Sequence, residues 1–239
     1  GGHRFEQITG LIGDGFQRGL GDLCRAGIAG HAVKRAARLR IPIGRAKACK
    51  GRDYHYLMII FQSLSDCLRI AAQRIGWGQD LPAGEGMGIA ISNWPHAGKQ
   101  QAGATVCAAT HVQVSQKGEL VVKRIDLTFD CGRIANKDAV LTQLEGGIIF
   151  GMNMSLNEEI TIRDGAVVEF NYHQYPMLRM AHMPEINVHF DALSGHDRFD
   201  IIGEAPVGPV GPAIGNAIFQ ATGKRLRSTP FRKHDLSWT

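Results

Sequence analysis

The chain has 239 residues and a formal net charge of +5, from 27 Lys and Arg against 22 Asp and Glu. Its hydrophobic fraction of 44% and charged fraction of 21% indicate a globular protein and exclude a fibrous or wholly disordered one. The longest apolar run, residues 56–61, is far shorter than the roughly 20 residues of a membrane-spanning helix, so we expect no membrane span. The five cysteines are widely spaced and form no C-x-x-C pair, which predicts free, mostly buried thiols.

The positive charge is concentrated at the start of the chain. Residues 1–53 hold 11 Lys and Arg against 4 Asp and Glu, whereas residues 54–239 hold 16 against 18. The first segment is rich in Gly, Ala and Arg and has no hydrophobic face, which favours disorder or a non-native segment such as the read-through of a shifted reading frame. The alternative is a flexible arm that binds phosphates, but aromatic residues that would stack on bases are almost absent, so we expect no nucleic-acid partner. We therefore separate a basic segment, residues 1–61, from a C-terminal domain, residues 62–239.

The rest of the chain has regular hydrophobic patterning that predicts hairpins separated by helices. In chain order, we expect a helix over 62–75, a loop over 81–88, strands over 105–114 and 120–129, a helix over 137–156, strands over 159–163 and 166–170, a strand over 185–190, a helix over 209–221 and a short strand over 225–228. This order is typical of an α+β fold, with hairpins and a mixed sheet packed against helices.

Local signals place the ends of several elements. Ser63 or Ser65 is a candidate cap for the first helix, and Gly76 is a candidate end. An Asp-Gly pair at 164–165 between apolar residues is a strong signal for a hairpin turn. The three glycines inside the helix over 137–156 cost helix stability, so we expect another backbone to pack closely there.

Generic catalytic and metal-binding motifs are missing from the sequence. The ten histidines have no H-x-x-x-H spacing, so we assign no metal ligand to the protein. Asp126 and Asp130 face the same side of a predicted strand, and we interpret them as solvated charges.

Glu204 is the one carboxylate whose surroundings suggest chemistry. It follows a short apolar segment, lies beside Gly203 and precedes a proline-rich turn into the last helix. A carboxylate set against apolar neighbours is a stronger base, which suits a general base that works near neutral pH. The alternative is a carboxylate that interacts with the positive end of a helix, and the residues alone favour that alternative.

Ordered motifs are spread from residue 76 to residue 225. They are Gly76-Trp77-Gly78 with Leu81-Pro82, Gly86 to Ala90, Asp130-Cys131-Gly132-Arg133 with Asn136, Gln143 to Ile148 with Phe150-Gly151, Asn171 to Ile186, and Gly203-Glu204 with Pro209, Pro212-Ala213, Asn216-Ala217, Thr222-Gly223 and Arg225. Together they resemble the molybdenum-cofactor-binding large subunits of the xanthine dehydrogenase/aldehyde oxidase family. The likeness is greatest to the branch of isoquinoline 1-oxidoreductase beta subunits and aldehyde dehydrogenases.

The resemblance implies a fold, a cofactor and a reaction. Residues 62–239 correspond to the C-terminal part of the molybdenum-cofactor-binding domain. Glu204 matches the catalytic base of an enzyme that oxidises an aldehyde or N-heterocycle with water as the oxygen source. Gly203, Gln101 and Gly103 are the candidate cofactor contacts, although the loop over residues 97–103 is interpreted equally well as a plain surface loop before a strand. The resemblance implies that the metal is held by the pterin rather than by protein side chains.

The resemblance also implies partners. The expected cofactor is the molybdenum–pterin group in its cytosine dinucleotide form, and the expected partners are an iron–sulfur small subunit, an electron acceptor and a small-molecule substrate. The compartment stays open between the bacterial cytoplasm and periplasm.

Two departures from the family pattern support an alternative. Ala205 stands where many relatives have Pro or Ser, and the chain is several times shorter than a family large subunit. The alternative is a catalytically inactive truncated fragment or a non-enzymatic binding module.

Overall fold

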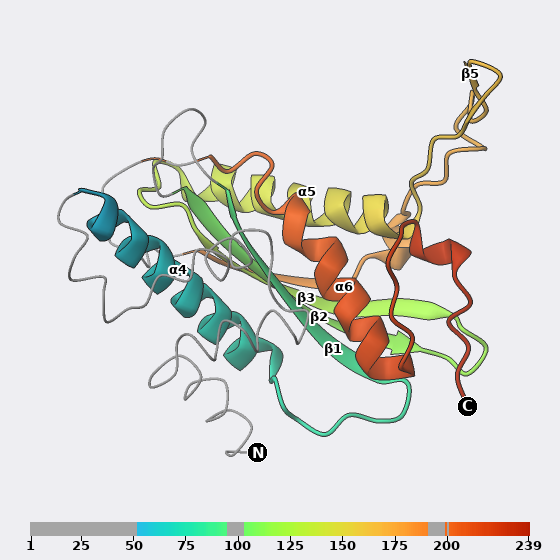
Figure 1. Cartoon of the computed structure of the whole chain (residues 1–239), viewed down its shortest axis with the longest axis horizontal. Helices are drawn as coiled ribbons and strands as arrows, with labels where there is room; N and C mark the ends of the chain where they lie inside the picture. Colours follow the sequence, from blue (N-terminus) through green and yellow to red (C-terminus); the bar gives the residue numbers. More distant parts are fainter. Residues whose placement is uncertain (1–51, 95–102, 191–198, 200) are drawn as a thin grey trace.

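The computed structural model describes residues 52–94, 103–190, 199 and 201–239, with side chains from residue 62 onward (Figure 1). The expected basic segment lies outside the described residues as far as residue 51. The elements are α4 (Arg52–Ile75), β1 (Glu85–Trp94), β2 (Ala104–Val114), β3 (Leu120–Asp130), α5 (Lys137–Leu156), β4 (Ile162–Arg163), β5 (Ala166–Val167), η2 (Met180–His182), β6 (Glu185–Phe190), α6 (Val207–Thr222) and η3 (Phe231–Lys233).

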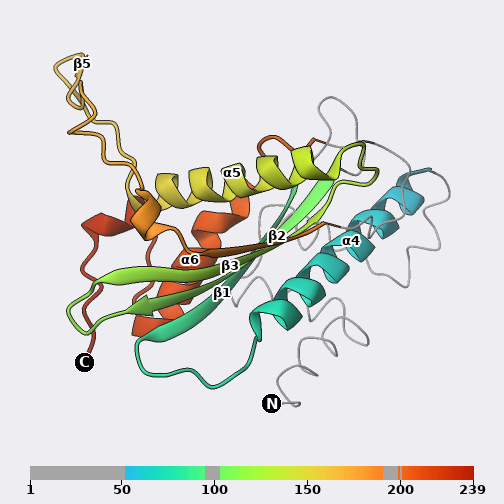
Figure 2. The same ribbon diagram turned by 180° about the vertical axis from the view of Figure 1, so that it is seen from behind.

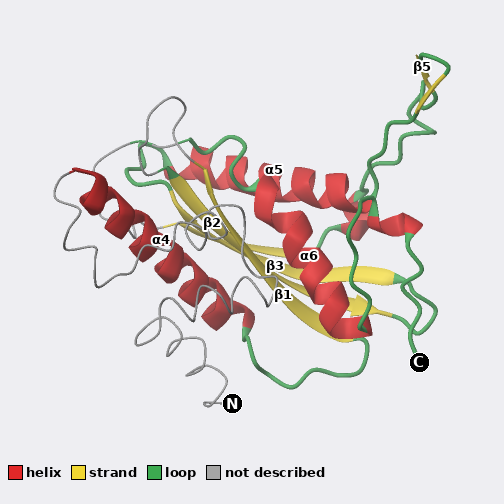
Figure 3. Cartoon of the chain, viewed as in Figure 1, coloured by secondary structure: helices red, strands yellow, loops and turns green. Residues whose placement is uncertain are grey.

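A four-stranded sheet is the centre of the fold. Its order is β1-β2-β3-β6, in which β1, β2 and β3 pair antiparallel and β6 runs parallel to β3. Helices α5 and α6 cover one face of the sheet, and α4 covers the other (Figures 1 and 2). The described part therefore confirms the predicted α+β class with a mixed sheet, which the colouring by secondary structure in Figure 3 makes plain.

Each face of the sheet has its own hydrophobic core. On the α5 and α6 side, buried residues of all three antiparallel strands, such as Val106 and Leu127, pack against helix residues such as Leu144 and Ile214. The core on the α4 side is smaller and is confined to α4, β1 and β2. Because neighbouring strand residues point to opposite faces, the two antiparallel strands β1 and β2 contribute side chains to both cores.

The loop expected over residues 81–88 is wrong in its second half, because residues 85–88 are the start of β1. Gly86 and Gly88 lie directly beneath α6. A Cβ atom at Gly88 would clash with the carbonyl oxygen of Ala213, and one at Gly86 would clash with that of Ala217. These glycines therefore allow a helix backbone to approach a strand, a role that differs from the loop formation they suggested.

Helix α5 has the predicted bounds, and the predicted close approach of another backbone is seen at Gly151. Asn136 caps its N-terminus, where the side chain accepts a hydrogen bond from the Ala139 N–H at 3.0 Å. A Cβ at Gly147 would meet the ring of Pro206, and one at Gly151 would meet the backbone of Val207. A Cβ at Gly146 would have no atom within 4 Å. Close packing therefore explains Gly147 and Gly151 but does not explain Gly146.

Two local predictions are wrong. Helix α4 begins at Arg52, so Ser63 and Ser65 lie inside it and do not cap it, although the helix ends before Gly76 as expected. Residues 225–228 form no strand, because this segment follows the left-handed Gly223 and folds back on α6. There Arg225 donates to the side chain of Asn216 and stacks on the ring of Phe219.

The predicted hairpin around Asp164-Gly165 is present as β4 and β5, although its paired part is short. Both turn residues have positive φ, 52° and 78°. The hairpin belongs to the segment between α5 and β6, residues 158–182, and the hairpin end of this segment projects from the body of the molecule in Figures 1 and 2. We call this segment the arm.

Within the described part, no helix is both long and apolar enough to cross a membrane. The described cysteines Cys67, Cys107 and Cys131 are buried, as expected. Burial raises the pKa of both the Cys67 and the Cys107 thiols, which keeps them protonated.

Candidate functional site

The described candidate residues lie toward the end of the sheet where β1 finishes and β2 begins. Gly103 is buried there, immediately before β2. The side chain of Asn93, near the end of β1, donates to the Gly103 carbonyl at 3.2 Å and to Thr105 Oγ1 at 3.0 Å. These bonds fix the backbone of Gly103 against the neighbouring strand.

Gly203 and Glu204 reach the same end from the other direction. They precede α6, whose early residue Gly208 lies over Ser92 of β1, with 3.8 Å between a Cβ built at Gly208 and Ser92 Oγ. The Gly203 carbonyl accepts a hydrogen bond from Gln143 of α5 at 3.0 Å. The segment that carries Glu204 is thus held by both α5 and α6.

The Glu204 side chain is exposed. Its backbone carbonyl accepts from the Val207 N–H at 3.1 Å, which starts the turn into α6. Its carboxylate makes no hydrogen bond or ion pair with any residue that the structure describes. Gly203 beside it has open space where a side chain would stand.

Of the four predicted site residues, the structure brings three to one end of the sheet. Gly103, Gly203 and Glu204 lie there, and Gln101 lies outside the described residues. Among the described residues, no group of three or more His, Cys, Asp and Glu side chains is placed to hold a metal ion.

The interpretation of Asp126 and Asp130 as solvated charges is wrong, because both are buried. Asp130 accepts hydrogen bonds from the Ser63 hydroxyl at 2.6 Å and from the Gly132 N–H at 3.2 Å. Asp126 pairs with Arg124, whose Nε and Nη2 lie 2.7 and 2.9 Å from its two carboxylate oxygens. Asp126 and Asp130, which point to the α4 side of the sheet, therefore make buried polar contacts within the fold.

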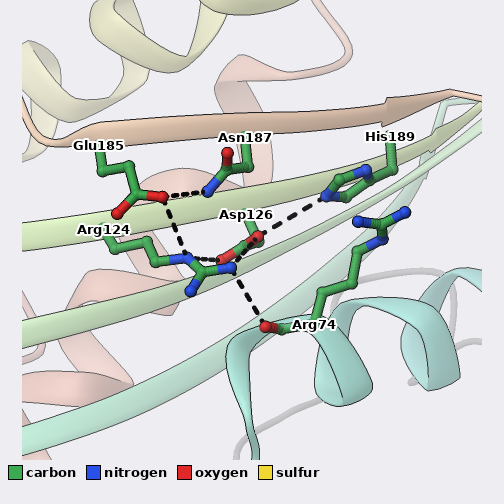
Figure 4. A network of polar contacts seen from close by, with 6 residues as sticks. All are labelled: Arg74, Arg124, Asp126, Glu185, Asn187 and His189. Atoms are coloured by element: carbon green, nitrogen blue, oxygen red, sulfur yellow. Dashed lines mark hydrogen bonds and ion pairs between the residues drawn. The ribbon is translucent and has the colours of Figure 1, made fainter.

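Figure 4 shows that Asp126 belongs to a wider polar network between β3, β6 and the end of α4. The register pairs Arg124 with Glu185 and Asp126 with Asn187. Arg124 also donates to the backbone carbonyl of Arg74 at 3.2 Å. Sequence reasoning missed this network, although polar residues at every second position of both strands were a signal for it.

His189 is the titratable group of this network. Its Nε2 lies 3.7 Å from Asp126 Oδ1, too far for a hydrogen bond. Burial, followed by the positive charge of Arg74, lowers the pKa of His189 below its ordinary value of 6.5, and the Asp126 carboxylate opposes that shift in part. The network therefore favours a neutral imidazole.

A cavity of about 480 Å³ lies at the opposite end of the sheet from Glu204, at the end of α6 and the chain terminus. Its lining is mostly polar and consists of Gln116, Ala221, Thr222, Lys224, Ser237, Trp238 and Thr239. None of these is a predicted site residue, so the cavity and the candidate site are separate features.

Comparison with known proteins identifies the family. The molybdopterin cofactor-binding domain matches residues 70–184. The beta subunit of isoquinoline 1-oxidoreductase from Brevundimonas diminuta is 33% identical over 170 residues, which is 69% of this chain and 20% of that protein. The chain belongs to the molybdopterin cofactor-binding family. It corresponds to a portion of the large subunit of a molybdenum hydroxylase.

Two further proteins are similar to parts of the chain. The membrane-bound aldehyde dehydrogenase (pyrroloquinoline-quinone) of Gluconacetobacter polyoxogenes is 34% identical over 184 residues, 73% of this chain and 23% of that protein. The crystal structure of aldehyde oxidoreductase from Desulfovibrio desulfuricans is 24% identical, with a TM-score of 0.47, and covers 53% of this chain and 14% of that one. The chain thus spans about a fifth of the length of its curated relatives.

Three described residues remain candidates for contact with a molybdopterin cofactor. Gly203 leaves its backbone open, Gly103 is held in place by Asn93, and Glu204 presents a carboxylate without a partner among the described residues. The matched region, residues 70–184, contains Gly103 but ends before Glu204.

Proposed function

We propose that this chain supplies Glu204 as the catalytic base of a molybdenum hydroxylase large subunit that oxidises an aldehyde or an N-heterocycle, with water as the oxygen source. The observation that carries the proposal is the position of Glu204. It is an exposed carboxylate without a described partner, fixed by its backbone at the end of the sheet that also holds Gly103.

In this reaction a carbon-bound hydrogen of the substrate is replaced by a hydroxyl derived from water, with release of two protons and two electrons. The molybdenum–pterin cofactor supplies the redox chemistry when it is bound. The Glu204 carboxylate accepts one proton, which requires an ionised and unpaired carboxylate close to the reacting atoms. A Lys or Arg partner for Glu204 would hold it in one state, and the described residues provide none.

The proposed cofactor is the cytosine dinucleotide form of the molybdenum–pterin group. Small residues let a ligand approach the backbone closely, so Gly103 and Gly203 are suited to contact polar pterin groups through their amides and carbonyls. Gln101, outside the described residues, is the third proposed contact. We further propose that electrons leave to iron–sulfur clusters on a small subunit and then to an acceptor.

The names of the relatives support the substrate class and the subunit arrangement. The isoquinoline 1-oxidoreductase beta subunit is named for an N-heterocycle and as a subunit. So is a nicotinate dehydrogenase subunit of Pseudomonas putida, which is 29% identical over 176 residues. Aldehyde oxidoreductase molybdenum-binding subunit PaoC of Escherichia coli, 32% identical over 122 residues, is named for aldehydes.

The test is Glu204→Gln in a complete large subunit, made by replacing the matched stretch of the Brevundimonas diminuta protein with this chain's residues 70–239. The amide keeps the size of the side chain but cannot accept the proton, so kcat/KM should fall by about 10²–10⁴-fold while molybdenum content stays unchanged. Glu119→Gln is the matched control, because Glu119 is also exposed but lies at the turn between β2 and β3, at the other end of the sheet. If Glu204→Gln kept full turnover, Glu204 would not be the catalytic base.

A second candidate function is a binding module without catalysis. The observations that favour it are the exposure of Glu204 and the small share of the relatives that the chain covers. It predicts that no molybdenum is found in the assembled large subunit, whereas the enzyme proposal predicts bound molybdenum.

A further inference from the structure

The arm carries most of the large hydrophobic side chains that are exposed in the described molecule. Of the twelve large hydrophobic side chains exposed in the described part, seven lie on the arm: Ile160, Ile162, Val167, Phe170, Tyr172, Met177 and Met180. Three of them, Phe170, Tyr172 and Met180, are 78%, 85% and 88% exposed. Single exposed apolar residues are ordinary, but such a concentration on one projecting segment marks an interaction surface.

The arm is held in one conformation by polar contacts among its own residues. The Val168 N–H donates to the Thr161 carbonyl at 2.9 Å, and the Thr161 N–H donates to a Glu169 carboxylate oxygen at 2.6 Å. Further along the arm, the Phe170 N–H donates to the Gln174 side chain at 3.2 Å. These bonds order the backbone of the arm. Its large apolar side chains stay exposed, although the Phe170 ring makes an edge-on contact with His173.

A single buried residue of α5 fixes the base of the arm. The Asn153 side chain donates to the Glu158 carboxylate, where the arm begins, and accepts from the Leu178 N–H at 2.9 Å, where it returns to the body. Lys233 of η3 forms an ion pair with Glu159. A fixed base directs the arm away from the body and reduces the entropy that docking would cost.

We propose that the arm docks into an apolar surface of the part of the large subunit that this chain does not contain. The proposal rests on the proposed function in one respect, namely that the chain works inside a large subunit. Two facts favour this occupant. The arm lies inside residues 70–184, which match the family domain, and the chain spans about a fifth of its relatives' length, so most of its natural surroundings lie elsewhere.

A second copy of the chain is the less favoured occupant. The arm, residues 158–182, has four Asp and Glu against two Lys and Arg. A symmetric pair of arms would bring these like charges together, whereas a different polypeptide surface can present apolar pockets and basic residues to them. The expected partner surface is therefore apolar, with a basic rim.

The experiment measures binding between the purified full chain and the Brevundimonas diminuta protein from which the matched 170-residue stretch has been deleted. The arm variant replaces Phe170, Tyr172 and Met180 with Ser. Because these side chains are exposed, the melting transition should not change, while binding should weaken by at least about tenfold. The control is Val121→Ser, which removes an exposed hydrophobic residue of β3 away from the arm and should bind like the unsubstituted chain.

Three outcomes would overturn the proposal. They are equal binding by the arm variant and the unsubstituted chain, no binding by the unsubstituted chain, or self-association of the chain that light scattering shows to be lost in the arm variant. The readout needs neither molybdenum nor turnover. Glu204→Gln should bind like the unsubstituted chain. A positive docking result would therefore stand even if Glu204 proved not to be the catalytic base, and a negative docking result would leave the catalytic proposal unaffected.

Discussion

Gly86 and Gly88 are the residues on which the contact between β1 and α6 depends. Glycine in a strand interior usually weakens it, but here the missing side chains allow α6 to lie directly on the backbone of β1. This contact sets the direction of α6 across the sheet and therefore the position of Glu204 just before it. The glycines far from the site thus determine where the carboxylate lies.

Gly88→Ala should lower the free energy of unfolding by about 2 kcal/mol or more, because the new methyl group meets the backbone carbonyl of Ala213, which cannot move without shifting α6. Urea unfolding of the purified chain measures the change. Gly146→Ala is the matched control, since its methyl group meets nothing and alanine favours a helix, and it should stabilise the chain by about 0.5–1 kcal/mol. Equal effects of the two substitutions would show that α6 is not in close contact with β1.

His189 should make the stability of the chain depend on pH. Because its pKa is lowered in the folded chain, the unfolded chain binds the proton first as the pH falls below 6.5, and stability is lost over the interval down to the lower folded value. Above pH 6.5 both states are neutral and this contribution is constant. The free energy of unfolding, measured in urea between about pH 7 and pH 5, should depend less steeply on pH in His189→Gln than in the unsubstituted chain. An unchanged dependence on pH would mean that other groups cause it.

At the scale of elements, helix α4 is joined to the sheet by a buried hydrogen bond as well as by its small core. The Ser63 hydroxyl donates to Asp130 at the end of β3, and Cys67 one turn later packs against β2. Because Asp130 is buried, the loss of a donor leaves part of its hydrogen-bonding capacity unmet.

Ser63→Ala should therefore destabilise the chain by about 1–3 kcal/mol. Ser65→Ala provides the control, because Ser65 lies in the same helix and is only partly buried, and it should change the free energy of unfolding by less than about 0.5 kcal/mol. Thermal melts of the two variants compare them directly. A Ser63→Ala variant as stable as Ser65→Ala would mean that the hydroxyl does not hold α4 to β3.

Most helices and strands could be predicted from the sequence, because their cores are periodic. The hairpin of β2 and β3, both helices of the larger core and β6 were all expected close to their observed bounds. Prediction failed where the same local sequence pattern can arise from two different structural settings. Glycines in β1 were assigned to a loop although tertiary contact explains them, and alternating polar residues in β3 were assigned to solvent although α4 and β6 bury them. Such contacts join segments far apart in the chain, so no local pattern contains them.

The candidate site was predicted in the same uneven way. The residues alone singled out Glu204 but favoured a carboxylate at the end of a helix, and only the family resemblance assigned Glu204 and Gly203 to a site. The structure adds that Gly103 reaches the same end of the sheet through β2. The Asp126–His189 network was missed because it needs β6 to pair parallel to β3, and sequence patterning does not report which strands are neighbours.

At the scale of the whole molecule, three surfaces are separated on one α+β domain. The end of the sheet near Glu204 presents the candidate site, the arm presents apolar side chains, and the far end contains the cavity near Lys224. A portion of a larger subunit is expected to have such uncovered surfaces. The exposure of Glu204 is consistent with a site whose other side comes from the rest of the large subunit.

Molybdenum content of the assembled large subunit tests the central claim most directly. The chain's residues 70–239 are placed in the Brevundimonas diminuta protein, the product is made in the presence of molybdate, and bound metal and pterin are measured after purification. The account predicts stoichiometric molybdenum and a pterin dinucleotide, in the unsubstituted protein and in Glu204→Gln alike. A folded large subunit without molybdenum would contradict it and would favour a binding module without catalysis.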